Sequence, residues 1–554
     1  MSVRIALNNQ PEFYTNLDEI SGRVILGVNR PEQISSITVK LEGEAVTALQ
    51  VPHPTHPADI NRNGPPPGPP GSLVAENHKI LYKVSQVFPD EYYSSGSNPY
   101  GAHPLQPGEH TFPFKFKLPL NNACSDQMAM SKIGGLGGLG GFGSGGGLFG
   151  IGGVRVMDGS KQLFLRHITK TLPPSITAFP GECEVRYYVK VTISRPGLLK
   201  ENWRYQVGFK FLPIEPPRPK ASTQEAFARR PFTFRPRTPQ PEKRKSGLFS
   251  KKNAEDKAPS TPETPPSIEV SARLPHPSIL TCNKPIPLRL VAKKLVDSPE
   301  QVYLSSLQID LIGTTEIRSH TIYNRKMNRW VVTTANNLSI PLCTNGGDKS
   351  QEFVIPDDLW RNVALPNTIA PSFTTCNLSR KYELELKLGL SWGKPKSDLM
   401  SKNPFGSNQP PPQTIWLPLH FGNIEVYSGI TPPPELVEAA RNTRPGAATL
   451  NFPPRLPPRT NTAPMPANAN TRPQQPARPQ AQGQAPAQPP ISDPLYPPQL
   501  AAGQSAPPPD DAPPSYDEAM ADNLSGPFDG QQDRPAYSGV TNENAPSQMP
   551  QTKS

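Results

Sequence analysis

The first 215 residues alternate repeatedly between apolar and polar positions, which is the pattern of half-buried β-strands. Clusters of turn residues separate these runs, and none of them has the spacing of an amphipathic helix. The apolar positions of five runs are Val3, Ile5 and Leu7; Ile37, Val39 and Leu41; Phe112, Phe114 and Phe116; Val185, Tyr187, Val189, Val191 and Ile193; and Tyr205, Val207, Phe209 and Phe211. The pattern predicts an antiparallel β-sandwich over residues 1–215.

Two stretches of this predicted domain lack alternation and are expected to be loop insertions. They are residues 52–72, which are rich in Pro, and residues 121–162, which contain a Gly-rich run. Such lengths are tolerated because the entropy of loop closure rises slowly with length. The second insertion includes an uncharged stretch from Ile133 to Val154. Because Gly contributes almost no transfer free energy, we expect a loop there and no transmembrane segment.

The second half of the chain predicts another domain and a tail. Residues 216–267 are rich in Pro, Arg and Lys and predict an interdomain linker. Alternation returns over residues 268–428, most clearly in the run that places Tyr382, Leu384, Leu386, Leu388 and Leu390 on one face. Residues 429–554, mostly Pro, Gln, Ala and Asn, predict a disordered tail. The expected fold class is therefore all-β, with two tandem sandwiches and a long Pro-rich tail.

Composition agrees with a chain that is only partly globular. The 554 residues include 75 prolines, 35% are hydrophobic, and the formal net charge of +11 comes largely from Lys and Arg crowded into residues 229–252. The N-terminus has no apolar signal region, and neither end carries a lipidation motif. The five cysteines are far apart in sequence, so we expect reduced thiols of a cytosolic protein rather than a zinc or redox site. They are Cys124, Cys183, Cys282, Cys343 and Cys376.

The sequence shows no catalytic signature. A GxGxxG match at 138–143 lies in the Gly-rich run without the strand, helix and acidic residue that a dinucleotide site requires. His110 and His167 show no spacing to acidic residues that suggests a catalytic pair. We therefore expect no enzymatic activity, no cofactor, no metal and no nucleic-acid partner.

Six segments resemble the arrestin fold of fungal arrestin-related trafficking adaptors, the alpha-arrestins. They are YTNLDEISGRVILGV, ISSITVKLEGEA, LQPGEHTFPFKFKLP, LPPSITAFPGECEVRYYVKVTISRPG, KYELELKLGL and WLPLHFGNIEV. The resemblance follows the chain in order over roughly residues 1–428, with the two insertions as departures. It implies two arrestin-like domains, 1–215 and 268–428. It also implies that such an adaptor becomes ubiquitinated on Lys.

One compact motif in the tail predicts a binding partner that fits this resemblance. Pro513-Pro514-Ser515-Tyr516 is followed by the acidic residues Asp517 and Glu518. Adjacent prolines favour polyproline II, which reduces the entropy lost on docking, and WW domains recognise such PPxY ligands. A chance match is possible in a Pro-rich tail, but the Tyr, the acids and the arrestin-like context favour a WW-domain-binding site.

Three weaker motifs flank it in the same tail. Two of them are PxY units, Pro494 with Tyr496 and Pro535 with Tyr537. Each unit alone is more simply explained by chance. Together with the main site, they could add avidity for an array of WW domains. Pro454, Pro457 and Arg459 have the spacing of an SH3 ligand, a match that Pro-rich tails produce often.

The linker contains a basic cluster with two serines inside it. A solvated linker is the default interpretation, binding of anionic lipid is the second and a nuclear localisation signal is the third. Phosphate on either serine would weaken attraction to lipid by cancelling charge, so the cluster could act as a switch. The residues are Lys243, Arg244, Lys245, Ser246, Ser250, Lys251 and Lys252.

Taken with the resemblance, the sequence predicts a cytoplasmic, non-enzymatic adaptor recruited peripherally to the plasma membrane and endosomes. Its sandwiches would engage cytoplasmic segments of membrane transporters or receptors. Its tail would recruit the WW domains of a HECT-type ubiquitin ligase, promoting ubiquitination, endocytosis and sorting of the cargo by proximity. The alternative is an arrestin-like signalling scaffold on a membrane receptor, of the ambient-pH-sensing type. A retromer-type coat subunit is a more distant rival that has no need of a PPxY tail.

Overall fold

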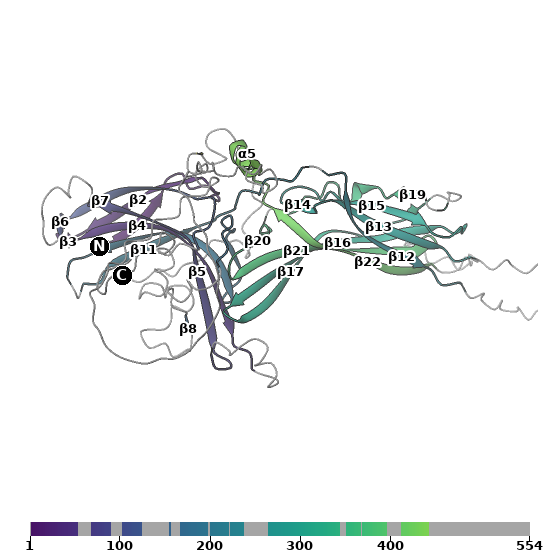
Figure 1. The fold of residues 1–554 in the computed structure, drawn as a ribbon, viewed down its shortest axis with the longest axis horizontal. Helices are drawn as coiled ribbons and strands as arrows, with labels where there is room; N and C mark the ends of the chain where they lie inside the picture. The colour runs from purple at the N-terminus through teal and green to yellow at the C-terminus, as the bar shows by residue number, and fades with distance from the viewer. Residues whose placement is uncertain are drawn as a thin grey trace, which may run out of the picture.

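The computed structural model describes residues 2–53, 68–89, 102–124, 155–156, 167–197, 200–220, 222–237, 264–343, 349, 351–366, 368–395, 412–442 and 524. Strands dominate these residues, which confirms the all-β fold class. No helix among them is long and apolar enough to cross a bilayer. Two β-sandwich domains lie one beside the other, the N-domain in purple and blue and the C-domain in teal and green (Figure 1).

The N-domain contains two main sheets. One has the order β1-β2-β7 and the other the order β11-β10-β4-β5-β8 with β9 beside β10, while β3 and β6 form a separate pair. The strands are β1 (Ser2–Leu7), β2 (Glu19–Val28), β3 (Glu32–Ile34), β4 (Ser36–Gln50), β5 (Leu73–Phe88), β6 (His103–Leu105), β7 (Gly108–Lys117), β8 (Arg155–Val156), β9 (Ile176–Phe179), β10 (Cys183–Ser194) and β11 (Trp203–Phe209).

The C-domain repeats this two-sheet plan. One sheet has the order β12-β13-β15-β19, and the other has the order β14-β22-β21-β16-β17 with β18 beside β16 and β20 beside β21. The elements are β12 (Glu225–Thr233), β13 (Ser267–Pro275), β14 (Ile279–Thr281), β15 (Arg289–Lys294), β16 (Val302–Ser319), β17 (Ile322–Ala335), β18 (Ile340–Leu342), β19 (Glu352–Val354), the 3-10 turn η1 (Asp357–Leu359), β20 (Phe373–Thr374), β21 (Leu378–Trp392) and β22 (Gln413–Tyr427).

The apolar faces predicted from alternation form the two cores. In β4, Val39 and Leu41 are fully buried and pair with the equally buried Val191 and Val189 of β10. In the C-domain, the alternating apolar residues of β21 are fully buried from Tyr382 to Leu390. The alternation of apolar and polar residues therefore predicts the buried faces of these strands correctly, because each strand buries one face against the opposite sheet.

The segment predicted as linker contains a strand and other ordered contacts. β12 lies within 216–267 and pairs antiparallel with β13 along its whole length. Its alternation is obscured in sequence by Arg229, Arg230 and Pro231, which are tolerated because β12 is an edge strand of its sheet. The predicted boundary at 267 is therefore too late: the C-domain sheet already begins at Glu225.

The segment predicted as tail begins with a helix. α5 (Pro434–Asn442) starts with Pro at its first position and Glu435 in the first turn, both favourable at a helix N-terminus. Its residues Leu436 and Ala439 are buried. Leu436 joins a small apolar cluster with Phe13, Leu17, Leu212, Ile214 and Ile430, against which Leu120 and Leu524 pack. The folded part of the chain thus extends past Gly429.

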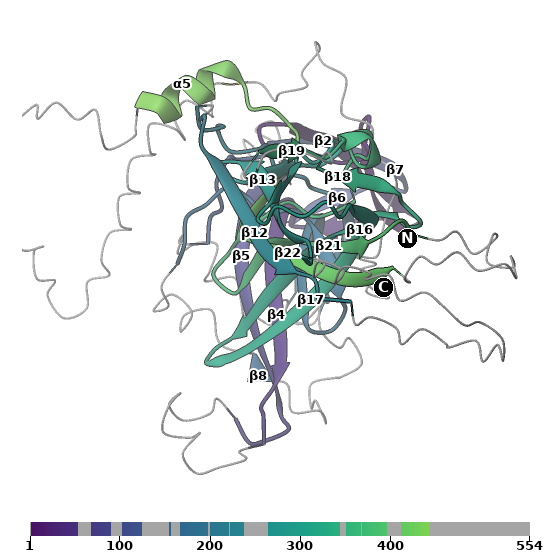
Figure 2. The ribbon, with the colours of Figure 1, turned by 90° about the vertical axis from the view of Figure 1, so that its right-hand side faces the viewer.

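The two domains share apolar core at their junction. Ile317 at the end of β16 and Leu378 at the start of β21 belong to the N-domain core cluster. The long strands β4, β5 and β17 run down together from the body of the molecule (Figure 2), and the turn between β16 and β17 docks against β4 and β5. This docking brings residues from both domains into one site.

Candidate functional site at the domain junction

The sequence-predicted binding residues all lie outside the described residues. This holds for the PPxY motif, the two PxY units, the SH3-type motif and the basic cluster at 243–252. The structure therefore leaves those predictions untested. It shows instead a polar site at the domain junction, to which the sequence motifs gave no guide.

Main-chain groups of β5 anchor the β16–β17 turn. The Ser319 hydroxyl donates to the Val74 carbonyl at 2.7 Å, and His320 Nε2 lies 3.2 Å from the Ala75 carbonyl oxygen. Across the same interface, the Thr47 hydroxyl donates to the Arg318 carbonyl at 2.6 Å. The turn is thus held to the N-domain by backbone acceptors, which fixes its position against β5.

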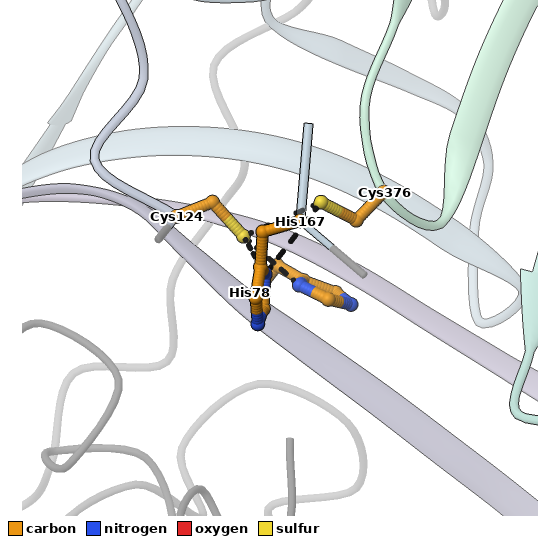
Figure 3. Close-up of side chains that lie close together, drawn as sticks. All are labelled: His78, Cys124, His167 and Cys376. Carbon is orange, nitrogen blue, oxygen red and sulfur yellow. Dashed lines mark hydrogen bonds between the residues drawn. The ribbon is translucent and has the colours of Figure 1, made fainter. Parts of the chain in front are cut away.

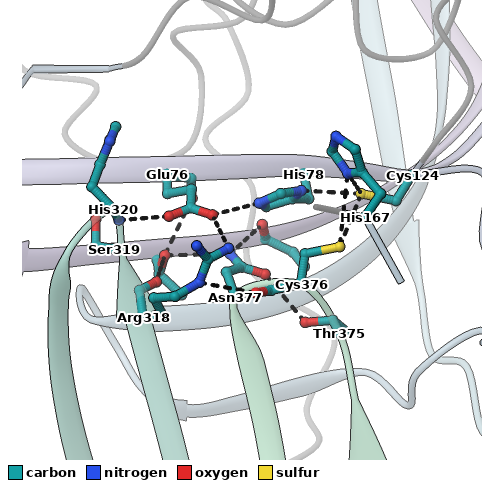
Figure 4. A network of polar contacts seen from close by, with 12 residues as sticks. Glu76, His78, Cys124, His167, Arg318, Ser319, His320, Thr375, Cys376 and Asn377 are labelled. Atoms are coloured by element: carbon teal, nitrogen blue, oxygen red, sulfur yellow. Dashed lines mark hydrogen bonds and ion pairs between the residues drawn. The ribbon is translucent and has the colours of Figure 1, made fainter. Parts of the chain in front are cut away.

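Glu76 of β5 is the centre of a polar network that crosses this interface (Figure 4). Its fully buried carboxylate accepts from Arg318 Nη2 at 2.8 Å and from the His320 backbone N–H at 2.6 Å, both in the C-domain. His78 Nε2 lies 2.6 Å from Oε1, the same oxygen that Arg318 binds, while the His320 N–H donates to Oε2. Burial acts to raise the pKa of Glu76, but these bonds together hold the pKa below its ordinary value.

The loop before β21 is fixed against the N-domain by the same network. Asn377 Nδ2 donates to the Ala45 carbonyl at 3.0 Å, and Arg318 Nε donates to the Cys376 carbonyl at 3.0 Å. Arg318 therefore binds Glu76 with one part of its guanidinium and orients the backbone of Cys376 with another. This arrangement turns the Cys376 side chain toward the N-domain.

A cluster of two cysteines and two histidines (Figure 3) lies next to Glu76 (Figure 4). Cys124 Sγ is 3.0 Å from His78 Nδ1, 3.1 Å from His167 Nδ1 and 3.5 Å from Cys376 Sγ. Cys376 Sγ is 3.8 Å from His167 Nδ1. We call these four residues the Cys/His cluster. Their donor atoms all lie within 4.8 Å of one another, so together they could hold a metal ion.

Four separate segments supply the Cys/His cluster. His78 comes from β5, Cys124 follows β7, His167 precedes β9 and Cys376 lies between β20 and β21. His78 and Cys124 are fully buried, whereas His167 and Cys376 are partly buried. The cluster thus joins three ligand-type side chains of the N-domain to one of the C-domain.

Electrostatics in the Cys/His cluster favour a thiolate. The hydrogen bond from the Cys124 thiol, with help from His78, lowers the pKa of Cys376 to about 3 in spite of burial. The same contact raises the pKa of Cys124. Burial acts to lower the pKa of His78, but its bonds to Cys376 and Glu76 raise it above the ordinary value. The Cys376 thiolate therefore lies beside an imidazole whose pKa is raised, in a partly buried site.

Sequence spacing could not reveal the Cys/His cluster. Its members are separated by dozens to hundreds of residues, and the scattered cysteines gave no motif. The available signal was the order Glu76-Asn77-His78, in which two polar residues share one face of a strand. Polar residues on an inward face indicate a buried polar site, but they do not identify the residues that meet there.

A second buried polar group lies farther along the N-domain sheet. Lys79 Nζ donates to Glu44 Oε1 at 2.5 Å and also bonds Glu42, while Arg186 binds Glu44 with Nη2 at 2.7 Å. The Tyr188 hydroxyl lies within hydrogen-bond distance of both carboxylates, 2.7 Å from Glu42 Oε2 and 2.9 Å from Glu44 Oε1. Burial acts to raise the pKa of Glu44, but Lys79 and Arg186 hold it far below its usual range. Two cations thus balance two buried carboxylates, so that removing any one partner would leave a buried charge uncompensated.

A cleft of about 450 Å³ also opens between the domains. The N-domain contributes Leu172 and Ile214 to its wall, and the C-domain contributes Phe373 and Tyr427. Glu215 also lines the cleft, and it is bound by Arg218 at 2.6 Å, which in turn donates to Thr281 Oγ1 at 2.9 Å. The junction is therefore held by polar contacts around an open groove.

Comparison with known families identifies the N-domain. Residues 3–135 match the family model "Arrestin (or S-antigen), N-terminal domain". The N-domain is arrestin-like. The match covers the strands from β1 to β7, so the resemblance noted in the first domain is confirmed for that region.

One curated relative of this chain is "Arrestin-related trafficking adapter 10" of Lachancea thermotolerans. The two are 30% identical over 130 residues, which is 22% of this chain and 28% of the relative. The aligned part thus spans less than a third of the relative. The likeness to this trafficking adapter therefore concerns that stretch of 130 residues.

Proposed function

We propose that this arrestin-related chain is an adaptor between membrane cargo and a WW-domain ubiquitin ligase of the HECT type. The two β-sandwiches bind a cytoplasmic segment of a transporter or receptor. The tail binds the ligase through Pro513, Pro514 and Tyr516. Cargo lysines are then ubiquitinated at high effective concentration, which leads to endocytosis and sorting.

One combination carries the proposal: an arrestin N-domain and a PPxY motif in the same chain. The family match and the name of the relative support an adaptor body. The motif Pro513-Pro514-Ser515-Tyr516 supplies the chemistry that WW domains recognise. The chain itself contributes proximity, and the ligase performs catalysis. An adaptor of this type acts at the cytoplasmic face of the plasma membrane and endosomes.

A peptide-binding experiment tests the ligase-recruiting step. A synthetic peptide covering residues 505–523 is titrated into isolated WW domains of a HECT ligase, beside the same peptide with Tyr516→Ala. We expect a Kd in the micromolar range, on the order of −8 kcal/mol of binding free energy, and loss of measurable binding in the variant. Equal binding of both peptides, or none, would refute the assignment of the motif.

A further inference from the structure

The Cys/His cluster has the composition and spacing of a metal centre. Around a tetrahedral Zn²⁺ with bonds to sulfur near 2.3 Å and to nitrogen near 2.0–2.1 Å, donor atoms lie about 3.3–3.8 Å apart. Four of the six separations between donor atoms of the Cys/His cluster run from 3.0 to 3.8 Å, and all six lie within 4.8 Å. We propose that the Cys/His cluster is a structural Zn²⁺ site that joins the N-domain to the C-domain.

The donor set selects zinc and a structural role. Two thiolates and two imidazoles in a tetrahedral arrangement suit Zn²⁺, whereas Mg²⁺ and Ca²⁺ require oxygen ligands. Four protein ligands complete the coordination shell and leave no position for water or substrate, which separates structural from catalytic zinc sites.

The groups around the Cys/His cluster support the ligands as they do in zinc sites. His78 directs Nδ1 into the cluster, while its Nε2 lies 2.6 Å from Glu76 Oε1. A carboxylate in that position orients the ring and increases its basicity as a ligand. The Ile168 backbone N–H donates to Cys376 Sγ at 3.3 Å, which stabilises a thiolate. Each of these contacts would be satisfied with the metal bound.

Charge balance explains how such a site can be buried. Two thiolates neutralise Zn²⁺, and the two imidazoles are neutral as ligands. Glu76 carries one negative charge and is paired with the Arg318 guanidinium at 2.8 Å. The site and its surroundings are therefore close to neutral, so that little uncompensated charge is removed from water.

The ligands come from both domains, so a bound zinc ion would connect the N-domain to the C-domain. His78, Cys124 and His167 belong to the N-domain, and Cys376 comes from the loop before β21 of the C-domain. A metal bound by all four links Cys376 to N-domain residues that lie at least 209 positions away in the chain. Binding free energy then contributes directly to keeping the two domains together.

Metal content of the full-length chain tests the proposal. The chain is produced in zinc-containing medium, purified with a thiol reductant and without chelator, and analysed for metals by inductively coupled plasma mass spectrometry. We expect about one zinc per chain, as four ligands hold one ion. Cys376→Ser should lower the zinc content at least about tenfold, since it removes one ligand. Cys343→Ser is the matched control, because this buried thiol lies outside the cluster, and it should retain the zinc.

A second measurement needs no variant. The wild-type chain is stripped with chelator, checked for folding by circular dichroism, and titrated with Co²⁺. Tetrahedral cobalt bound by thiolates should give intense visible bands and a sulfur-to-metal charge-transfer band, which added Zn²⁺ removes. The proposal is overturned if the folded chain binds neither ion, if Cys376→Ser retains full zinc, or if the purified chain contains a Cys124–Cys376 disulfide in place of metal.

Discussion

Arg318 of the C-domain and Glu76 of the N-domain form an ion pair across the junction, with 2.8 Å between Nη2 and Oε1. Glu76 is fully buried and Arg318 is 21% exposed. The pair lies between the docked β16–β17 turn and the Cys/His cluster. It therefore couples the position of the C-domain to a carboxylate that also orients His78.

Replacing the cation should loosen this junction. Arg318→Met leaves the buried Glu76 carboxylate without its C-domain charge partner and releases the backbone of Cys376. Breaking a fully buried pair costs roughly 3–5 kcal/mol; we expect about 2–3 kcal/mol here because Arg318 is partly exposed. Urea denaturation followed by circular dichroism measures the loss in the free energy of unfolding.

An exposed arginine on the next strand is the control for that change. Arg325 binds Glu316 at 3.2 Å, and the two side chains are 67% and 36% exposed. Arg325→Met should therefore change the free energy of unfolding by less than about 0.5 kcal/mol. Equal effects of the two substitutions would contradict the importance of the buried pair.

The buried Glu44 should make stability depend on acid pH. Its pKa in the folded chain lies far below the ordinary value of 4.5 because Lys79 and Arg186 stabilise the carboxylate. Its contribution is therefore complete above the unfolded-state pKa near 4.5 and declines as the pH falls below it, toward the lower folded pKa. The slope approaches about 1.4 kcal/mol for each pH unit.

Comparison with Glu44→Gln isolates this contribution. The variant should be less stable than the wild type at neutral pH by about 3 kcal/mol, because Lys79 and Arg186 lose a buried partner. Below the unfolded-state pKa the difference between the two proteins should shrink as the pH falls. Urea unfolding at a series of pH values measures it, and a difference that stays constant into the acid range would disprove the interpretation.

Gly22 in β2 should tolerate no side chain. A Cβ there would lie 2.5 Å from the Ala6 carbonyl oxygen in β1 and 2.8 Å from the Phe114 ring in β7. Gly22→Ala should destabilise the N-domain by about 1–3 kcal/mol through overpacking. Gly422→Ala in β22 meets nothing within 4 Å and should be neutral or slightly stabilising. Thermal unfolding compares the two, and a stable Gly22→Ala would contradict the close approach of β1.

Ubiquitination of the adaptor itself tests the proposed ligase interaction in the full chain. In a reconstituted reaction with a HECT ligase that contains WW domains, ubiquitin should be transferred to lysines of the chain. Tyr516→Ala should reduce the initial rate at least about tenfold, which corresponds to about 1.4 kcal/mol of lost binding. Tyr537→Ala, in a PxY unit without the first Pro, should change the rate by less than about twofold. The reverse order of effects would assign recruitment to the secondary motif.

Cargo clearance separates the trafficking adaptor from a receptor scaffold. Cells that lack the chain should retain more of its cargo at the surface, and cells expressing Tyr516→Ala should resemble them. Surface labelling followed by quantitative proteomics measures this for all membrane proteins at once. Normal surface levels in both cases would favour the signalling scaffold instead.

Local pattern in the sequence was enough to determine the strands and their buried faces. The period of two in residues such as Val39 and Leu41 depends only on neighbours along one strand, so it survives in any correct fold. The same reasoning missed β12, whose alternation is masked by charged residues and Pro on a sheet edge, and α5, which is short and follows a Pro-rich stretch. Both acquire stability from contacts with distant segments rather than from their own pattern.

Only the tertiary structure could bring together the Cys/His cluster and the Glu76–Arg318 pair. Cys124 and Cys376 are 252 positions apart in the chain, yet their sulfur atoms are 3.5 Å apart in the fold. Such proximity depends on how two domains dock, and no spacing rule along one chain encodes it. Conversely, a PPxY motif can be recognised in the sequence without a tertiary structure. Its polyproline geometry and its Tyr ring are properties of a short peptide. The sequence by itself therefore determined the buried faces of strands such as β4 and β21 and supplied the tail motif, whereas domain docking decided the polar junction and its proposed metal.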